Sequence, residues 1–284
     1  MAVSGLSDFR GRWFVVKIGG ELAMDKPKLA ASVGAAVRAF LEAGIRVAVI
    51  HGGGPQATEM QKRLGLQPKM VAGRRYTDEA TLEVMKMTLA GQVSVDVASA
   101  FRIAGVPALC TTGMSAGLID AKRRPPKVMS GAGPEPVDLG LVGDVTGVNT
   151  EAFQRISDAG FVPVLGSLSG DAQGNVFNVN ADTVATRVAA KLGAAKLFLV
   201  SNVPGVLANK DEPSTRLPTL TPAEARAKIA SGVIQGGMIP KVEESLEMLE
   251  EGIEAIHIVG ISPNDAVLRE AEKAGSQGTA FLRG

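Results

Sequence analysis

The sequence contains a single cysteine, Cys110, so it cannot form a disulfide within the chain. Structural disulfides are typical of secreted proteins and rare in the reducing cytoplasm. Cys110 follows Pro107-Ala108-Leu109 in a predicted strand, and we interpret it as a small buried hydrophobic residue rather than a catalytic thiol. The cysteine count therefore indicates the cytoplasm.

Aromatic residues, excess charge and long apolar runs are also scarce. Aromatics make up 4% of the chain, too few for a surface that stacks on nucleic-acid bases. A net charge of +1 gives no general attraction to nucleic acids or acidic membranes. No apolar run reaches the roughly 20 residues of a membrane span, and residues 1–12 lack the apolar segment of a signal peptide. These absences predict a soluble cytoplasmic protein that binds neither nucleic acid nor membrane.

Stretches with strand and helix patterns alternate along all 284 residues. Strands are predicted near residues 13–18, 46–50, 106–111, 162–166, 197–201, 255–260 and 279–282, with helical patterns between most of them. Such alternation is typical of an α/β fold, a three-layer αβα sandwich around a mainly parallel open sheet. The pattern restarts near residue 196, which predicts two lobes, residues 1–195 and 196–284.

Two of the predicted strands end in glycine-rich turns. The strand 47–50 leads into His51 and then Gly52-Gly53-Gly54, and the strand 14–18, which carries Lys17, leads into Gly19-Gly20. Glycines at a strand-to-helix turn expose backbone N–H groups, and the positive end of the next helix favours an anion there. Either turn alone can be a tight connection and nothing more. The pair predicts a cleft for phosphate or carboxylate.

Other familiar catalytic motifs are missing or incomplete. The sequence has neither a G-x-x-x-x-G-K-[ST] loop nor a G-x-G-x-x-G fingerprint between a strand and a helix. Gly113-Met114-Ser115-Ala116-Gly117 fits the nucleophile elbow of hydrolases, and His257 lies downstream. An elbow needs a well-packed helix next, whereas the basic and proline-rich residues 122–126 follow here. We therefore disfavour a hydrolase.

Lys17, Asp182 and Lys241, together with the glycine turns, fit phosphoryl transfer better. That reaction needs cations and N–H donors around a negatively charged transition state, with little covalent help from the protein. A lysine from each lobe can hold opposite sides of the transferred group, and one aspartate can orient both ammonium groups. Sequence spacing alone does not show that the three residues meet, and each lysine alone could be a surface charge.

Four further segments carry expectations about local structure. Residues 70–76 form a loop or hairpin with two arginines, residues 122–136 an irregular exposed arm, and residues 137–148 a short hairpin. Gln235-Gly236-Gly237-Met238 is another glycine-rich turn before a helix. Thr221, Pro222 and Glu224 have the spacing of a capping box and predict a helix start.

Several of these stretches together resemble the amino-acid kinase family over nearly the whole chain. They are VVKIGG, VIHGGGPQ, GRRYTDEATLEV, VDLGLVGDVTGVN, NVNADTVA, SNVPGVL and GGMIPKVE. GRR-T-D-x-x-T-L-E-V and N-V-N-A-D are typical of the members that phosphorylate N-acetyl-L-glutamate. The resemblance implies ATP-dependent phosphorylation of the side-chain carboxylate of that substrate in arginine biosynthesis, with Mg²⁺ held largely by the nucleotide and by no protein metal site.

The resemblance also implies a role for individual residues. Lys17 and Lys241 would stabilise the transferred phosphoryl group, Asp182 would orient both lysines, and the N–H groups of Gly20, Gly52 and Gly53 would hold the reacting oxygens. Arg75 and Asn178 would bind the α-carboxylate. The nucleotide would lie against the C-terminal lobe, at Ser201, Asn202, Gly205, Val206, Leu207 and Gln235. The N-terminal lobe would bind acetylglutamate and dimerise.

The chain departs from the family pattern at three positions. Asn202 stands where an aspartate is usual, Ser94 lies where a V-N-K run is common, and Met114 replaces the lysine of a G-K-D run. Only about a dozen polar residues precede the first strand, so we expect a homodimer without strong inhibition by arginine. A regulator of the PII type has no support in the sequence.

Two other functions stay open at this point. One is a related kinase acting on a carrier-bound aminoadipate or glutamate, which Ser201-Asn202-Val203-Pro204-Gly205 slightly favours. The other is a non-catalytic sensor of an amino acid or a nucleotide. Lys17, Asp182 and Lys241 argue against a sensor, since binding alone does not need a lysine from each lobe.

Overall fold

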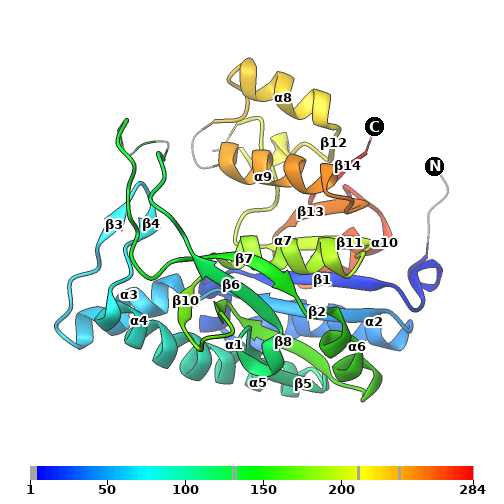
Figure 1. Ribbon diagram of the computed structural model, residues 1–284. Coiled ribbons are helices and arrows are strands. Elements are labelled where there is room, and N and C mark those ends of the chain that lie inside the picture. The colour runs from blue at the N-terminus through cyan, green and yellow to red at the C-terminus, as the bar shows by residue number, and fades with distance from the viewer. Residues whose placement is uncertain (1–4, 130, 132, 210–211, 236–237, 284) are drawn as a thin grey trace.

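The computed structural model describes residues 5–129, 131, 133–209, 212–235 and 238–283, arranged around an eight-stranded sheet (Figure 1). Across the sheet the strands are β12 (Thr219–Leu220), β14 (Thr279–Leu282), β13 (Ala255–Val259), β11 (Lys196–Val200), β1 (Trp13–Ile18), β2 (Arg46–His51), β8 (Val162–Gly166) and β5 (Ala108–Thr112). Of these paired neighbours, β13 and β14 run antiparallel and the others parallel. The predicted α/β fold with a mainly parallel open sheet is confirmed.

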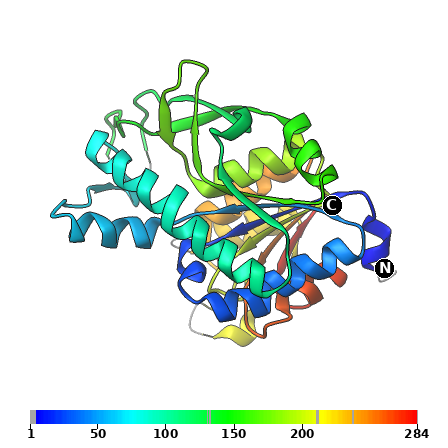
Figure 2. The same cartoon turned by 90° about the horizontal axis from the view of Figure 1, so that it is seen from below.

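Helices cover both faces of this sheet (Figures 1 and 2). On one face lie α6 (Thr150–Asp158), α7 (Ala181–Lys191) and α9 (Met238–Glu250), with α8 (Pro222–Ala230) beside α9. On the other face lie α1 (Lys26–Leu29), α2 (Ala35–Glu42), α5 (Ser94–Ile103) and α10 (Ala266–Glu272). Each face buries its own apolar cluster, so the predicted three layers are present.

Alternation along β1 decides which side chains reach which face. Successive strand residues point to opposite faces, and Phe14, Val16 and Ile18 join the cluster beneath α2, α5 and α10. Val15 joins the opposite cluster, beneath α7. Lys17 follows Val15 by two positions, so it leaves the sheet on the α7 side at the carboxyl end of the strand.

Two long helices each contain a π-helical segment. The first runs from α1 through Ala30–Gly34 to α2, and the second from α4 (Glu79–Met85) through Lys86–Val93 to α5. Asp78 starts the second by accepting a hydrogen bond from the N–H of Thr81, and the predicted capping box starts α8. No helix in the described ranges is long and apolar enough to cross a membrane.

A second, four-stranded sheet was not predicted. Its order is β10 (Val176–Asn178), β9 (Leu168–Gly170), β6 (Ile119–Arg123) and β7 (Gly143–Val148). The expected hairpin over residues 137–148 is wrong, because only β7 is a strand there and it pairs with the distant β6. The expected hairpin with two arginines is confirmed as β3 (Met70–Val71) and β4 (Arg74–Arg75). Gly236 and Gly237 of the predicted turn lie outside the described residues, and α9 begins at Met238.

Candidate active site

The two glycine turns touch each other at the carboxyl ends of β1 and β2. A Cβ atom added to Gly20 would lie 2.8 Å from the Cα atom and 2.9 Å from the nitrogen of Gly53, so a larger residue would push the turns apart. Gln56, in the first turn of α3 (Gly54–Arg63), donates a 2.6 Å hydrogen bond to the carbonyl of Gly20. The N–H of Gly52 donates to the carbonyl of Ile18 and so extends the ladder between the strands. The expectation that this N–H holds a reacting oxygen is therefore wrong, because the strand ladder already uses it.

Two helices begin beside these turns. Helix α3 starts at Gly54, and α7 starts at Ala181 behind Asn180, whose side chain accepts a 2.7 Å hydrogen bond from the N–H of Asp182. The first N–H groups of a helix have no partner within it, and the helix dipole adds positive potential at this end. The paired helix starts therefore favour an anion between them.

Lys17 and Asp182 form an ion pair next to the glycine turns. The Nζ atom of Lys17 lies 2.9 Å from Oδ1 of Asp182, and the two side chains are 13% and 22% exposed. Lys17 leaves β1 on the face that α7 covers, and the Asn180 cap places Asp182 in the first turn of that helix. The predicted contact between Lys17 and Asp182, which are far apart in the sequence, is present.

Lys241 lies on α9 and does not reach this pair. Its side chain makes no ion pair or hydrogen bond among the described residues. Glu244, one turn further along α9, lines the pocket at the site. Burial raises the pKa of Glu244 and the nearby Asp182 raises it further, while Arg74 and Lys17 act in the opposite direction. Thus α9 faces the site, but Asp182 contacts one of the two expected lysines.

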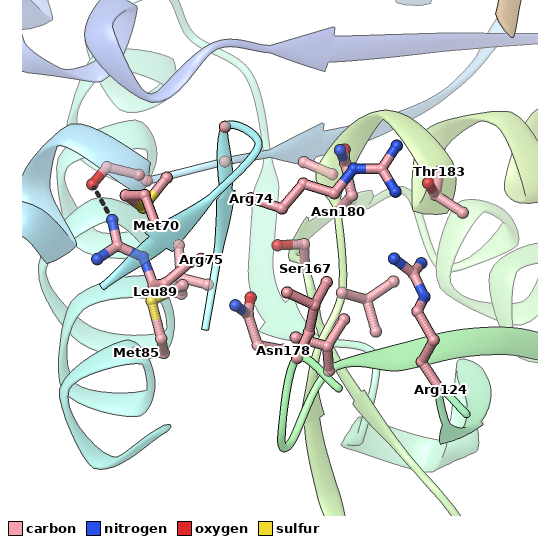
Figure 3. A pocket seen from close by; sticks show the side chains of 18 of the residues that line it. Met70, Arg74, Arg75, Met85, Leu89, Arg124, Ser167, Asn178, Asn180 and Thr183 are labelled. Atoms are coloured by element: carbon pink, nitrogen blue, oxygen red, sulfur yellow. Dashed lines mark hydrogen bonds between the residues drawn. The ribbon is translucent and has the colours of Figure 1, made fainter. Parts of the chain in front are cut away.

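A cavity of about 270 Å³ opens beside the glycine turns (Figure 3). Its lining includes Gly52, Gly53, Arg74, Arg75, Arg124, Ser167, Asn178, Asn180, Thr183 and Glu244. Three arginines face one carboxylate in this set, so the lining is net positive. Amide and hydroxyl groups between the arginines add neutral donors and acceptors. The cavity suits a small molecule that carries several negative charges.

Arg75 and Asn178 are held in place by neighbours. One terminal nitrogen of Arg75 donates to the carbonyl of Gly54 at 3.1 Å (Figure 3) and to Oγ1 of Thr58 at 2.7 Å, and the other donates to Gln61. Burial lowers the pKa of Arg75. Asn178 donates to Oγ1 of Thr77 at 3.1 Å. Both predicted carboxylate-binding residues line the cavity with fixed orientation.

Arg124 is a cavity residue that the sequence did not reveal. It follows β6, and its Nε and one terminal nitrogen each lie 2.7 Å from Oδ1 of Asp144 on β7. The guanidinium points toward Thr183 across the cavity (Figure 3). Arg124 lies in the stretch that the sequence predicts to be an irregular arm, and its partner Asp144 is 20 residues away. No local pattern therefore marks Arg124. No local pattern marks Glu244 either, because one glutamate among several on α9 is typical of a solvated surface charge.

The predicted nucleotide segment lies at the same edge of the sheet. Ser201 directly follows β11 and is buried, its N–H bonded to the carbonyl of Val259, whereas Asn202 is exposed. Gly205 has a φ angle of +142°, and a Cβ there would lie 2.7 Å from Oγ1 of Thr279. Thr279 also accepts a 2.8 Å hydrogen bond from the N–H of Val206. Glycine is therefore required at this turn.

The two remaining residues predicted to bind the nucleotide, Leu207 and Gln235, make fewer contacts with their surroundings. Leu207 forms an isolated bridge with Arg216. Gln235 is exposed in the loop after α8 and donates to the carbonyl of Gly232. The exposed side chains of Asn202 and Gln235 are free to contact a ligand without losing core packing.

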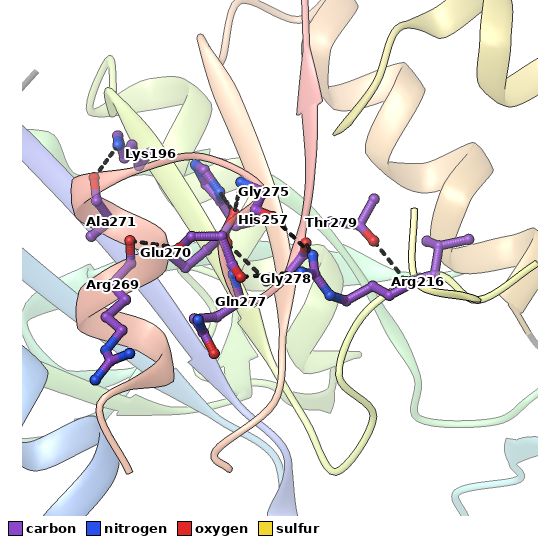
Figure 4. Close-up of polar contacts among 12 residues, drawn as sticks. Lys196, Arg216, His257, Arg269, Glu270, Ala271, Gly275, Gln277, Gly278 and Thr279 are labelled. Atoms are coloured by element: carbon purple, nitrogen blue, oxygen red, sulfur yellow. Dashed lines mark hydrogen bonds and ion pairs between the residues drawn. The ribbon is translucent and has the colours of Figure 1, made fainter. Parts of the chain in front are cut away.

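A buried polar network fixes the loop that leads into Thr279 (Figure 4). Glu270 on α10 accepts hydrogen bonds from Nδ1 of His257 at 2.8 Å, and from the N–H groups of Gly275, Gln277 and Gly278 at 2.7 to 2.8 Å. Arg216 donates to carbonyls of the same loop. Burial pushes the pKa of Glu270 upward, but His257 and the backbone donors bring it below its usual range.

The alternative nucleophiles are excluded by their surroundings. Ser115 is exposed on a short turn, whereas His257 is completely buried against Glu270, so they form no catalytic pair. Burial raises the pKa of Cys110 to about 11, so its thiol stays protonated at neutral pH. The part of the chain that the structure describes contains no group of three His, Cys, Asp or Glu side chains arranged to hold a metal ion.

Comparison with known proteins gives concordant relatives. The sequence pattern of the amino acid kinase family matches residues 12–260. The chain is 50% identical to an acetylglutamate kinase of Sorangium cellulosum (strain So ce56) over 269 residues, which cover 94% of both chains. It is also 50% identical to an acetylglutamate kinase of Anaeromyxobacter dehalogenans (strain 2CP-C) over 268 residues, 94% of this chain and 98% of that one.

Among solved structures, an N-acetylglutamate synthase from Neisseria gonorrhoeae, complexed with coenzyme A and N-acetyl-glutamate, superposes with a TM-score of 0.80 at 24% identity. The match covers 98% of this chain and 61% of that one. At this identity the likeness concerns the fold.

Proposed function

This chain belongs to the amino acid kinase family, and from that premise we propose that it phosphorylates the side-chain carboxylate of N-acetyl-L-glutamate with ATP. The product is N-acetyl-L-glutamyl 5-phosphate, an intermediate of arginine biosynthesis. The observation that carries the assignment is the Lys17–Asp182 pair beside two touching glycine turns. The 50% identity to two acetylglutamate kinases over nearly their full length supports the substrate.

The reaction needs little chemistry from the protein beyond positioning and charge. A glutamate side chain has a pKa near 4.3, so at pH 7 the attacking carboxylate is already ionised and needs no general base. One of its oxygens forms a bond to the γ-phosphorus as the bond between that phosphorus and the bridging oxygen of ADP breaks. Negative charge is spread over the phosphoryl oxygens during transfer, and nearby cations and N–H donors stabilise it.

The residues divide these tasks between the two lobes. In our proposal Lys17 stabilises the phosphoryl group from the N-terminal lobe, residues 1–195, and Asp182 holds Lys17 in place. The N–H groups of Gly20 and Gly53 contact the reacting oxygens, and Gly52 leaves room for them. Arg75 and Asn178 bind the α-carboxylate, because a guanidinium fork suits a planar anion.

Lys241 and the nucleotide segment belong to the C-terminal lobe, residues 196–284. Ser201, Asn202, Gly205, Val206, Leu207 and Gln235 contact ATP in this proposal. Since Lys241 does not contact Asp182 in this structure, it joins the site when α9 moves toward α7. Mg²⁺ fits as an ion held by the ATP phosphates, because an oxygen of Asp182 is taken by Lys17. When bound, the ion would neutralise part of the phosphate charge.

We also propose a homodimer that works in the cytoplasm, where ATP-dependent biosynthesis takes place. Met87, Val95 and Ile103 are each more than half exposed along one long helix, and Leu109 is exposed on the edge strand β5. Apolar side chains at a sheet edge favour a protein contact. Light scattering should give twice the mass of one chain, and a monomer or a hexamer would contradict the proposal.

The test of the function is a hydroxamate assay. The protein is incubated with MgATP and N-acetyl-L-glutamate, free glutamate or N-acetyl-aminoadipate, and hydroxylamine traps any acyl phosphate while ADP release is followed. Hydroxamate from N-acetyl-L-glutamate alone supports the proposal. Nucleotide binding without hydroxamate from any acceptor would contradict it and favour a carrier-linked kinase or a sensor. Lys241→Ala should lower turnover far more than ATP binding, since its contact is made in the transition state.

A further inference from the structure

His51 is a buried residue of the site region with no role in the reaction described above. It is the last residue of β2 and is directly followed by Gly52. Its Nδ1 atom lies 3.0 Å from the carbonyl oxygen of Gly52, and its Nε2 atom lies 3.0 Å from Oγ of Ser94. Burial lowers the pKa of His51, so the ring is neutral at pH 7. Its two nitrogens thus join a glycine turn to a helix.

Ser94 directly follows the π-helical segment Lys86–Val93 and is itself buried. Its hydroxyl is placed to donate to the carbonyl oxygen of Leu89 at 2.8 Å, and its Oγ atom also lies 3.0 Å from Nε2 of His51. The hydroxyl has one hydrogen, and a neutral imidazole has one donor and one acceptor nitrogen. The carbonyl oxygen of Gly52 can only accept, so its 3.0 Å contact with Nδ1 is a hydrogen bond when the ring hydrogen is on Nδ1. Nε2 is then an acceptor, and the hydroxyl of Ser94 donates to it when the hydroxyl turns from Leu89. In that arrangement the hydroxyl of Ser94 favours the tautomer that binds the glycine turn.

The bond to the Gly52 carbonyl determines where the N–H of Gly53 points. Both groups belong to one planar trans peptide, in which C=O and N–H point in opposite directions. Once the carbonyl is directed at His51, the N–H of Gly53 faces away from it. The nitrogen of Gly53 lies 2.9 Å from the place of a Cβ on Gly20, so this nitrogen faces the other glycine turn. Glycine adopts many backbone conformations, so this peptide needs an outside restraint.

Close packing fixes the ring and the peptide together. A Cβ on Gly166 would lie 3.2 Å from Cε1 of His51 and 3.1 Å from the carbonyl oxygen of Leu89. A Cβ on Gly53 would lie 2.5 Å from Cδ2 of Leu89. The π-helical segment therefore holds the turn in two ways, through the side chain of Leu89 and through Ser94 and His51. π-Helical turns often occur at functional sites.

We propose that His51 and Ser94 are positioning residues that fix the Gly52–Gly53 peptide so that the N–H of Gly53 points at the transferred phosphoryl group. This inference rests on the proposed function for the role of Gly53. It also gives a role to Ser94, where the sequence departs from the V-N-K run common in the family. Without the serine hydroxyl the ring hydrogen moves to Nε2 in part of the molecules. Nδ1 and the carbonyl oxygen then face each other as two acceptors, and the peptide turns away.

Ser94→Thr and Ser94→Val form a matched pair, because threonine and valine have nearly the same shape and differ in the hydroxyl. We expect Ser94→Thr to keep kcat within about threefold of the parent protein. Ser94→Val should lower kcat about tenfold relative to Ser94→Thr, which corresponds to about 1.4 kcal/mol of transition-state stabilisation. The KM for ATP should agree within about twofold between the two, since the nucleotide segment is not touched. Equal kcat values would overturn the proposal.

Nitrogen-15 NMR of the two histidines gives a second readout that does not depend on activity. His51 and His257 are the only histidines in the chain, and a His257→Gln sample assigns their signals. His51 should carry its hydrogen on Nδ1 in the parent protein and in Ser94→Thr, and show a mixture of tautomers in Ser94→Val. A hydrogen on Nε2 in the parent protein would refute the relay even if the enzyme is active. Failure of the hydroxamate assay in the parent protein would instead refute the proposed function.

Discussion

A lysine and a carboxylate come close on both faces of the central sheet, and the two carboxylates differ in how many hydrogen bonds they accept. On the α7 face, Lys17 and Asp182 form one ion pair and stay partly exposed. On the α10 face, Glu270 is fully buried and accepts from His257 and three backbone N–H groups. Lys196 lies nearby, with its Nζ bonded to the carbonyl of Ala271 and placed 4.7 Å from the ring of Phe9.

This difference distinguishes the proposed active site from a structural network. An ammonium has three N–H donors, and Lys17 uses one of them on Asp182, so donors remain for a ligand. Burial lowers the pKa of Lys196 to about 8, with the charge of Glu270 acting against that shift. A buried carboxylate that accepts four hydrogen bonds stabilises the fold, whereas a partly exposed ammonium with free donors at a cavity can bind a ligand. A lysine and a carboxylate therefore serve ligand binding on the α7 face in our proposal and stabilise the fold on the α10 face.

Replacing each of the two lysines with methionine should give the largest difference in kcat between the two faces. Lys17→Met should lower kcat by about 10³-fold, because it removes a cation from the transferred phosphoryl group. Lys196→Met should leave kcat within about threefold, since methionine still packs against Phe9 and the lysine lies on the far face. ADP release with N-acetyl-L-glutamate measures both. Similar losses in the two variants would mean that Lys17 acts through the fold.

Replacing the two carboxylates should affect the α10 face more than the α7 face when the free energy of unfolding is measured. Glu270→Ala leaves His257 and three backbone N–H groups without their acceptor, so the free energy of unfolding should fall by about 3–5 kcal/mol. Asp182→Asn removes one side of a partly exposed ion pair and should cost about 1 kcal/mol or less. Urea denaturation of both variants gives the values. An equal loss would show that Asp182 holds the fold as strongly as Glu270 does.

The pH dependence of stability should report the buried histidines. Burial lowers the pKa of both His51 and His257, so below about pH 6.5 the unfolded chain binds protons that the folded chain does not. The free energy of unfolding should therefore fall as pH decreases from about 6.5 to 5, by up to about 1.4 kcal/mol per pH unit for each histidine. His257→Gln should remove one histidine's share of this slope. An unchanged slope would place His257 outside the buried network.

The sequence predicted the elements that local patterns describe. Strand β1, the glycine turns and the capping box at Thr221 follow from hydrophobic spacing and turn chemistry, and the structure has them. The contact between Lys17 and Asp182 could be expected in detail only through the family resemblance, because 165 residues separate them. Parallel strands explain why the two glycine turns lie side by side, since neighbouring strands end at the same edge.

The missed features depend on pairing between distant segments. β9 and β10 have three residues each, too few for a visible alternation, and β7 finds its partner in β6 rather than in the adjacent chain. Gly140, with a φ angle of +75°, lies before β7 and made residues 137–148 resemble a hairpin. Arg124 enters the cavity because Asp144 on β7 binds it. Such positions follow from the second sheet, which the sequence pattern does not reveal.

Glu244 is a third carboxylate, which lines the cavity on α9, and its replacement should give the smallest effect of the predicted changes. It lines a cavity in which three arginines favour an anion, and its own charge opposes that preference. Glu244→Gln should therefore lower the KM for N-acetyl-L-glutamate by roughly threefold at pH 8, since two charges across a solvated site interact weakly. Because the pKa of Glu244 is raised, its carboxyl takes up a proton sooner as pH falls, and the gap between variant and parent should narrow at pH 6. Initial rates at the two pH values measure this change. A KM that rises in Glu244→Gln would show instead that Glu244 orients Arg74 for the substrate, which would place it with Asp182 as a residue that holds a cation for catalysis.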